Sequence, residues 1–126
     1  MEAANNDLDA SAFCAYLGPD FTFYAADSSG GANATRSGGR ADFCNFVKSG
    51  FQMMRQGGVK QSVKSGPYKV VISADKTTAV VTYESVVSIS VSGAGTVSSR
   101  CQSEDTMGSY AGQVVVLRST GQCSTK

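Results

Sequence analysis

The alternation of apolar and polar residues in the second half of the chain constrains the fold most. From Gln61 onward, apolar side chains recur at every second position, which is typical of β-strands with one buried face. Three short segments rich in turn-forming residues interrupt this pattern, at residues 74–77, 92–95 and 110–113. Connections this short join antiparallel neighbours, so the sequence predicts a meander of four strands.

The first half of the chain has helical spacing instead. Residues 2–17 carry an apolar stripe, and Gly18-Pro19 is expected to end this helix because proline cannot continue it. The aromatic and β-branched residues 21–24 then begin a strand. Residues 27–39 are rich in Gly and Ser and predict a loop, and residues 40–54 predict a second helix with an acidic first turn. The predicted fold class is α+β, with helices packed against an antiparallel sheet.

Composition narrows the classes of function. The 126 residues are expected to form one domain, residues 1–126, with a sizeable core. The 11 basic and 10 acidic residues give a formal charge of +1, which offers no electrostatic case for a nucleic-acid or anionic-membrane partner. No apolar run approaches the roughly 18–20 residues that a membrane span needs. Because the chain has no histidine, Ser-His-Asp catalysis and His-ligated zinc are excluded, and we expect no metal or cofactor.

The order and spacing of these segments resemble the NTF2-like superfamily, and within it the SnoaL-like and ketosteroid-isomerase-like group. The resemblance rests on three stretches: AANNDLDASAFCAYLGPDFTFY near the start, GGRADFCNFVKSGF in the second helix and SEDTMGSYAGQVVVLRSTG near the end. It implies an NTF2-like (cystatin-like) cone, in which a curved antiparallel sheet wraps around N-terminal helices and leaves a pocket at the open end. It also implies that the outer face of the sheet often forms a dimer.

Hairpins that are symmetric about their turns would bring four polar residues into one row on the inner face of the sheet. Tyr68 is then opposite Tyr83. Asp105 is then opposite Tyr83 on one neighbouring strand and Ser119 on the other. A single β-bulge would shift this register. The other residues predicted on this face are apolar: Val70, Ile72, Ala79, Val81, Met107, Val115 and Leu117.

Asp105 is the residue around which a site can be built. A carboxyl group on an apolar face needs hydrogen-bonding partners or a raised pKa. The resemblance to ketosteroid isomerases aligns Asp105 with an Asp that donates a hydrogen bond to a developing oxyanion. The general base of that group aligns with Ala25, and Asp27 follows two residues later. Asp105 is therefore either a catalytic or ligand-contacting group, or a structural carboxylate at the pocket rim.

Three functions remain open. The first is binding of a small, largely apolar molecule. The second is a SnoaL-like or ketosteroid-isomerase-like lyase, isomerase or cyclase that uses Asp105 and either Tyr83 or Tyr68 for proton transfer. The third is a non-catalytic interaction module whose cone is filled by phenylalanines, and an empty pocket that reaches Asp105 would argue against it. The candidate ligand-binding residues are Tyr16, Tyr68, Tyr83, Asp105, Met107 and Ser119.

The opposite face of the sheet suggests a partner. The same register places Glu84 opposite Glu104, with Arg118 diagonal to Glu104. An apolar surface on an outer face favours a covering partner, so the sequence predicts a homodimer. The prediction rests on five valines assigned to this face: Val71, Val80, Val86, Val114 and Val116.

The four cysteines allow two disulfides. The register places Cys101 opposite Cys123, which is close enough for a bond. Cys14 and Cys44 each lie on the apolar side of a predicted helix, and these helices are expected to pack together. The alternative is four buried free thiols that behave as small apolar residues. Paired cysteines would indicate a periplasmic or secreted protein, and free cysteines a cytoplasmic one.

Overall fold

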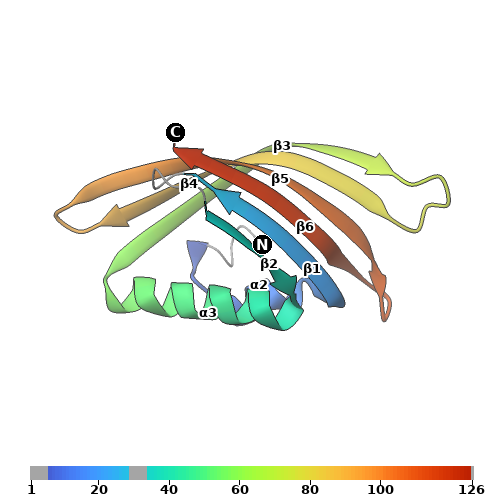
Figure 1. Cartoon of the computed structure of the whole chain (residues 1–126), viewed down its shortest axis with the longest axis horizontal. Helices are drawn as coiled ribbons and strands as arrows, with labels where there is room; N and C mark the ends of the chain where they lie inside the picture. Colours follow the sequence, from blue (N-terminus) through green and yellow to red (C-terminus); the bar gives the residue numbers. More distant parts are fainter. Residues whose placement is uncertain (1–5, 29–33, 126) are drawn as a thin grey trace.

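The computed structural model describes residues 6–28 and 34–125, and over these residues a six-stranded sheet arches over two helices (Figure 1). The strand order is β2-β1-β6-β5-β4-β3, with β1 and β6 parallel and all other neighbours antiparallel. The α+β class is confirmed, although the sheet is mixed rather than wholly antiparallel. The elements are α2 (Ala10–Ala15), β1 (Leu17–Asp27), β2 (Ala34–Gly39), α3 (Arg40–Gln56), β3 (Val59–Ile72), β4 (Ala79–Val91), β5 (Gly95–Tyr110) and β6 (Gln113–Thr125).

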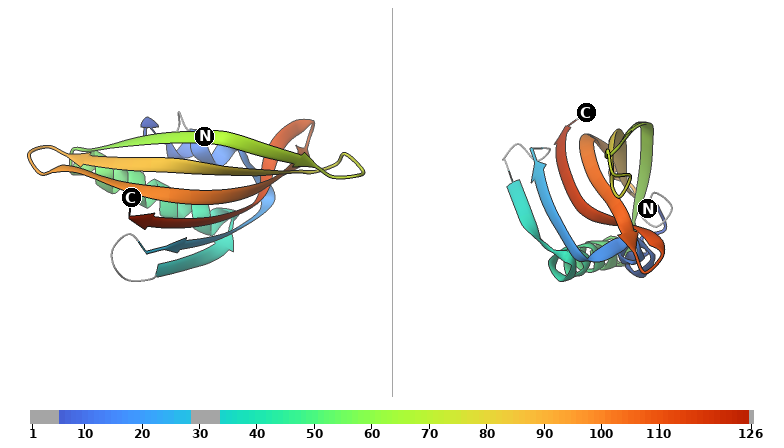
Figure 2. Two further views of the ribbon diagram at one scale, coloured as in Figure 1. Left: turned by 90° about the horizontal axis from the view of Figure 1, so that it is seen from above. Right: turned by 90° about the vertical axis from the view of Figure 1, so that its right-hand side faces the viewer.

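The sheet has an inner face toward the helices and an outer face away from them. Figure 2 shows α3 lying beneath the curled sheet, while the β3–β4 and β4–β5 hairpins extend beyond it at opposite ends. The described helices include none that is long and apolar enough to cross a membrane.

Helix α3 forms close to where the sequence predicts it. Asp42 in its first turn accepts a hydrogen bond from the Gly39 backbone N–H at 3.0 Å, which stabilises the helix start. Its buried residues, Val47 and Phe51, are one helical turn apart and face α2. The helix ends at Gln56, two residues beyond the predicted end.

The first predicted helix, residues 2–17, is wrong at both ends, since residues 7–9 are not helical either. Helix α2 begins after Asp9, whose side chain accepts a hydrogen bond from Ala12 N at 3.0 Å, and it ends at Ala15. Leu17 already belongs to β1, so Gly18-Pro19 lies within a strand instead of ending a helix. The physical reason is tertiary, because Leu17 is buried and pairs with Val116 of β6. Residues 2–5 of the predicted helix lie outside the described residues.

Strand β2 lies in a segment that the sequence predicts as loop. Residues 34–39 pair antiparallel with residues 22–27 of β1, while residues 29–33 lie outside the described residues. The side chains of an edge strand are mostly exposed, so β2 lacks the apolar alternation that would have revealed it. Arg36 of β2 places its guanidinium 4.3 Å from the ring centroid of Phe46, which links this edge to α3.

Aromatic residues join the helices to the sheet. Phe43 of α3 lies 5.6 Å from Phe13 of α2, measured between ring centroids. It also lies 5.3 Å from Phe21 and 4.8 Å from Phe23, both on β1. Phe43 therefore connects the two buried clusters of the core, one between the helices and one between α3 and the sheet.

Both predicted disulfides are present. Cys14–Cys44 joins α2 to α3, and Cys101–Cys123 joins β5 to β6. The second bond connects residues that are directly opposite in the sheet, as the predicted register requires.

The predicted register is correct for β3–β4, correct for β5–β6 only between the bulge and the far end of the hairpin, and wrong for β4–β5. Tyr68 pairs with Tyr83, and Asp105 pairs with Ser119, as predicted. Tyr83, however, pairs with Ser103 rather than Asp105. The β4–β5 turn closes between Val91 and Gly95, which moves the pairing by two residues. A shift of two preserves the face of every side chain, so the predicted inner face survives.

The same shift changes the predicted charge pattern of the outer face. Glu84 pairs with Gln102, and Glu104 pairs with Thr82, so the predicted opposition of two glutamates is wrong. Glu84 instead forms an ion pair with Arg100 at 3.3 Å.

A β-bulge in β6 changes which residues face inward. Thr106 pairs with Arg118, but Met107 pairs with Val116, so Leu117 is the extra residue. Val116 is consequently buried in the inner core, and Val114 turns to the inner side as well. The prediction of five outer-face valines is therefore wrong for two of them. Val115 and Leu117, predicted inside, instead pack beside Gly18.

Candidate functional site

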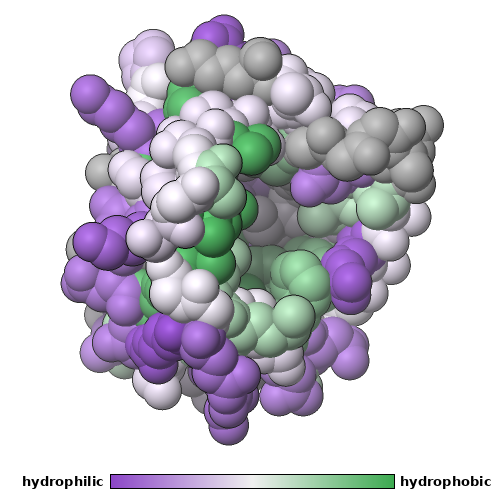
Figure 3. All heavy atoms as spheres, turned by 90° about the vertical axis from the view of Figure 1, so that its left-hand side faces the viewer, coloured by the Kyte–Doolittle hydropathy of each residue, from purple (hydrophilic) through white to green (hydrophobic). Residues whose placement is uncertain are grey.

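A hollow lies between α2 and the inner face of the sheet, with a volume of about 440 Å³. Seen end-on, the molecule is hollowed between hydrophobic side chains (Figure 3). Strands β3 to β6 supply most of the wall, since every second residue of each strand faces this side. The predicted cone is therefore not filled by its phenylalanines.

Asp105 is the buried acidic group of this hollow. Its side chain is only 6% exposed. Tyr83 on β4 donates its hydroxyl proton to Asp105 Oδ2 at 2.8 Å, and Ser119 on β6 donates to Asp105 Oδ1 at 2.6 Å. Each carboxyl oxygen thus accepts a hydrogen bond from a neighbouring strand. Such partners satisfy a buried carboxylate, which would otherwise be costly to remove from water.

Tyr83 is held as a hydrogen-bond donor. Burial raises the pKa of its hydroxyl well above the ordinary value, and the negative charge of Asp105 and the hydrogen bond to it raise the pKa further. The hydroxyl therefore stays protonated at neutral pH, so Tyr83 cannot serve there as a general base. Its ring lies 5.2 Å from that of Tyr68 between centroids, and both rings line the hollow.

The structure brings most of the predicted site residues together. Tyr16, Tyr68, Tyr83, Asp105 and Met107 all line the hollow. Ser119 is not among the lining residues, but it donates a hydrogen bond to Asp105.

The sequence reasoning missed other lining residues, although two signals could have found them. Ser85 and Ser103 have the same strand parity as Tyr83 and Asp105, so the alternation alone places them on the inner face. Phe13 lies on the apolar stripe of the first helix, which also faces the hollow. The Cys101–Cys123 disulfide forms part of the wall too.

The sequence resemblance aligns the general base of ketosteroid isomerases with a residue that has no carboxyl group. This residue is Ala25, which is paired with Gly121 of β6. Asp27 lies at the exposed end of β1, opposite Cys123, and is not among the residues that line the hollow. Within residues 6–28 and 34–125, no three Cys, Asp or Glu side chains gather as a metal site would require.

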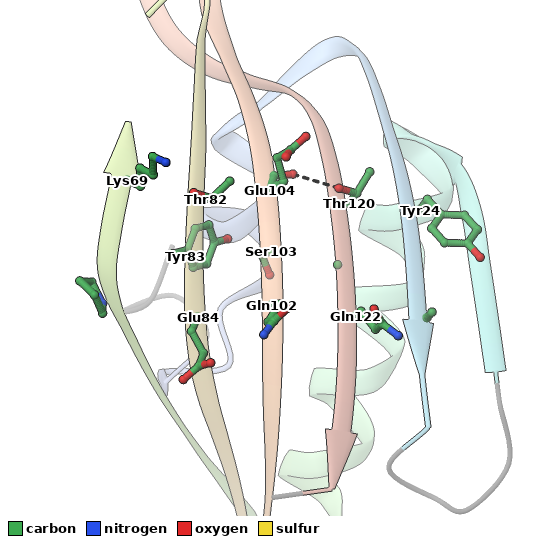
Figure 4. Close-up of a pocket in the computed structure, with 13 residues that line it drawn as sticks. Tyr24, Lys69, Thr82, Tyr83, Glu84, Gln102, Ser103, Glu104, Thr120 and Gln122 are labelled. Carbon is green, nitrogen blue, oxygen red and sulfur yellow. Dashed lines mark hydrogen bonds between the residues drawn. The ribbon is translucent and has the colours of Figure 1, made fainter. Parts of the chain in front are cut away.

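A second, larger hollow of about 830 Å³ lies on the outer face of the sheet. Figure 4 shows its polar side chains on neighbouring strands, with Thr120 donating to the Glu104 backbone carbonyl at 3.5 Å. Lys69, Thr82, Glu104, Thr120 and Tyr24 form one row across five strands. Both helices lie on the other side of the sheet, so this hollow is a surface depression. The partly enclosed inner hollow is the better candidate for a small-molecule site.

The protein is therefore an α+β protein whose curved sheet has a hollow on its inner face. Comparison with solved structures shows that this is the NTF2-like, cystatin-like fold. An NTF2-like protein with a cystatin-like fold from Novosphingobium aromaticivorans matches with a TM-score of 0.69 and 20% identity, over 96% of this chain and 73% of its own. The resemblance predicted from the sequence is thereby confirmed at the level of the fold.

Other structural neighbours are described as enzymes or as enzyme-like. A candidate scytalone dehydratase from Novosphingobium aromaticivorans matches with a TM-score of 0.75 and 15% identity, over 97% of this chain and 75% of its own. A ketosteroid isomerase-like protein from Erwinia carotovora atroseptica matches with a TM-score of 0.65 and 15% identity, over 96% and 85%. No protein-family model and no curated protein sequence matches the chain.

Proposed function

We propose that the protein binds a small, largely apolar molecule in the inner hollow, with Asp105 as its polar anchor. The observation that carries this proposal is a buried carboxylate in the wall of an otherwise mainly apolar cavity. A volume of about 440 Å³ lies within the range of small-molecule pockets. A solid core would have supported the interaction module instead.

A neutral solvatochromic dye such as Nile red tests this proposal. We expect its fluorescence to rise and shift to the blue when it enters the hollow of the wild-type protein. Ser103→Phe should reduce dye affinity about tenfold or more, because the larger ring fills space beside Asp105. Gln102→Phe is the matched control, since it adds the same ring to the same strand on the exposed outer face. Equal affinity in both variants would contradict binding in the inner hollow.

The alternative function is a lyase, isomerase or cyclase that uses the same hollow. It is supported by the neighbouring structures described as a dehydratase and as isomerase-like. Asp105 would accept a proton, and Tyr68 would donate a hydrogen bond to the substrate, because the Tyr83 hydroxyl already donates its proton to Asp105. Product analysis by mass spectrometry, with an identified ligand and Asp105→Asn as the comparison, separates an enzyme from a binding protein. Conversion of the ligand by the wild type alone would favour the enzyme.

The oligomeric state and the compartment are part of the proposal. Two disulfides support a location outside the cytoplasm, in the periplasm or secreted medium. We also propose a homodimer through the outer face of the sheet. This proposal rests on the three valines that remain on that face, Val71, Val80 and Val86. Light scattering coupled to size exclusion tests the dimer, and a monomer at micromolar concentration would contradict it.

A further inference from the structure

We infer that the ligand of the inner hollow is a cation, either a protonated or a quaternary amine, recognised by the Asp105 carboxylate and the aromatic rings around it. This inference rests on the proposed binding function and names the ligand class for the same site. Three features of the hollow support it: its charge, its aromatic rings and the hydrogen bonds of Asp105.

The hollow has a negative charge and no positive one. Among the described residues that line it, Asp105 is the only acidic residue, and none is Lys or Arg. The basic side chains of neighbouring elements are engaged elsewhere. Arg40 donates to the Cys14 and Leu17 carbonyls, and Arg55 donates to the Leu8 carbonyl. The lysines of β3 lie on its outer side, at Lys60, Lys64 and Lys69.

An anionic ligand would therefore meet an uncompensated like charge in a partly enclosed, apolar space. Electrostatic repulsion is strong where water is scarce, so the hollow selects against carboxylates and phosphates. A cation, by contrast, would replace its lost hydration with the attraction of Asp105.

Four aromatic rings line the same hollow, from Phe13, Tyr16, Tyr68 and Tyr83. The Tyr68 and Tyr83 rings are inclined by 46° with their centroids 5.2 Å apart, so they form an angled pair of walls rather than a closed stack. Tyr16 and Tyr68 are about half exposed, which places both at the solvent side of the hollow. Aromatic faces attract cations through the quadrupole of the ring, and quaternary ammonium groups are recognised in this way.

The hydrogen bonds of Asp105 favour a cation over a ligand that needs a proton from this residue. Both carboxyl oxygens accept hydrogen bonds, from Tyr83 and Ser119. Stabilising an oxyanion would require a donor at Asp105, and the Tyr83 proton is already used. These two hydrogen bonds hold the carboxylate in position. Its oxygens keep further lone pairs, which can face an ammonium group.

The inference is tested with three small molecules of one shape. Choline carries the positive charge. Its uncharged carbon analogue has a tert-butyl group in place of trimethylammonium. The anion is tert-butylacetate, the carboxylate of tert-butylacetic acid. Binding is followed by NMR of methionine methyl groups, since Met107 lines the hollow and Met53 is 71% exposed on α3. We expect choline to bind more than about fivefold more tightly than the uncharged analogue, because one cation–π interaction of ordinary strength provides about that factor and the charge of Asp105 adds to it. Tert-butylacetate should bind most weakly.

Asp105→Asn should reduce the preference for choline over the uncharged analogue to about the fivefold or less that the aromatic rings provide, because it keeps the shape and removes the carboxylate charge. Glu104→Gln is the matched control, since it removes the same charge from the adjacent residue on the outer face and should leave the preference unchanged. If Asp105→Asn does not fold, the comparison of the three molecules on the wild type still decides the question.

Two results separate failure of this inference from failure of the proposed function. Nile red binding without any preference for choline would overturn the cationic ligand and leave the binding function intact. Absence of binding by Nile red and by all three small molecules would overturn both.

Discussion

The inner and outer faces of the sheet are built from alternate residues of the same strands, yet they place side chains with the same functional group in opposite environments. Glu104 and Asp105 are neighbours on β5. Glu104 is exposed on the outer face, while Asp105 is buried with a hydrogen bond to each oxygen. The outer face also carries hydroxyl pairs, such as Ser88 and Ser98 at 3.0 Å. Residue type alone therefore does not identify the site, and the face on which a carboxyl group lies decides its chemistry.

The largest difference between the faces should appear when aromatic side chains of β1 are truncated. Phe21 is 1% exposed on the inner face, and Tyr24 is 50% exposed on the outer face. Phe21→Ala should lower the free energy of unfolding by about 3–5 kcal/mol, since it leaves a cavity in the core. Tyr24→Ala should lower it by about 1 kcal/mol or less. Chemical denaturation measures both, and equal losses would contradict the assignment of the faces.

The two carboxylates of β5 should also differ in what they contribute to stability. Asp105→Ala removes the acceptor of two hydroxyl groups, from Tyr83 and Ser119, and should cost about 2–4 kcal/mol. Glu104→Ala should change the free energy of unfolding by about 0.5 kcal/mol or less, as is usual for exposed positions. Denaturation midpoints test this pair, and a cost at Glu104 as large as at Asp105 would contradict it.

Alkaline pH should weaken the fold through Tyr83. Its pKa is raised in the folded state, so above about pH 10 the unfolded chain loses this proton while the folded protein retains it. Stability contributed by Tyr83 is therefore present at neutral pH and is lost as the pH rises above about 10. The advantage of the wild type over Tyr83→Phe should shrink over that range in thermal unfolding, and Tyr24→Phe is the control. An advantage that does not change with pH would show that Tyr83 is not held by Asp105.

The smallest effect is expected in the turn between β3 and β4, which belongs to neither face. Hydrogen bonds from the Ser73 hydroxyl and from the Thr77 hydroxyl and backbone lower the pKa of Asp75 from 3.8 to about 2. Because the pKa of Asp75 is lowered in the folded protein, its carboxylate stabilises the fold at pH values above 3.8. This contribution is lost as the pH falls toward 2. Asp75→Asn should therefore cause a slight drop in melting temperature at pH 6 and none near pH 2. NMR titration of Asp75 checks the pKa itself.

Local features of the sequence predicted the fold where the chain turns tightly. The β5–β6 turn has Ala111 and Gly112 in the left-handed region and pairs Tyr110 with Gln113. The bulge at Leu117 then shifts the register by one residue, which gives the predicted pairs of Asp105 with Ser119 and of Cys101 with Cys123. The β4–β5 turn is centred one residue earlier than we expected for a symmetric hairpin. The predicted pairing of β4 with β5 was therefore wrong by two residues. Tyr83 still reaches Asp105, because its long side chain spans the diagonal between neighbouring pairs.

Features that depend on distant contacts could not be predicted from local patterns. The bulge at Leu117 places this side chain beside Gly108 and Gly18, where a side chain on Gly108 would come within 2.5 Å of Leu117. Pairing of Leu17 with Val116 likewise ended the first helix early. These two contacts decide which valines face inward and hence how much of the outer face is apolar.

The most direct test of the account is the response of the methionine methyl groups to Nile red in solution. Met107 lines the inner hollow, whereas Met53 is exposed on α3. We expect the Met107 signal to shift and saturate as dye is added, the Met53 signal to stay in place, and Ser103→Phe to remove the effect. A dye that binds while the Met107 signal remains unchanged would show that the ligand site lies outside the inner hollow.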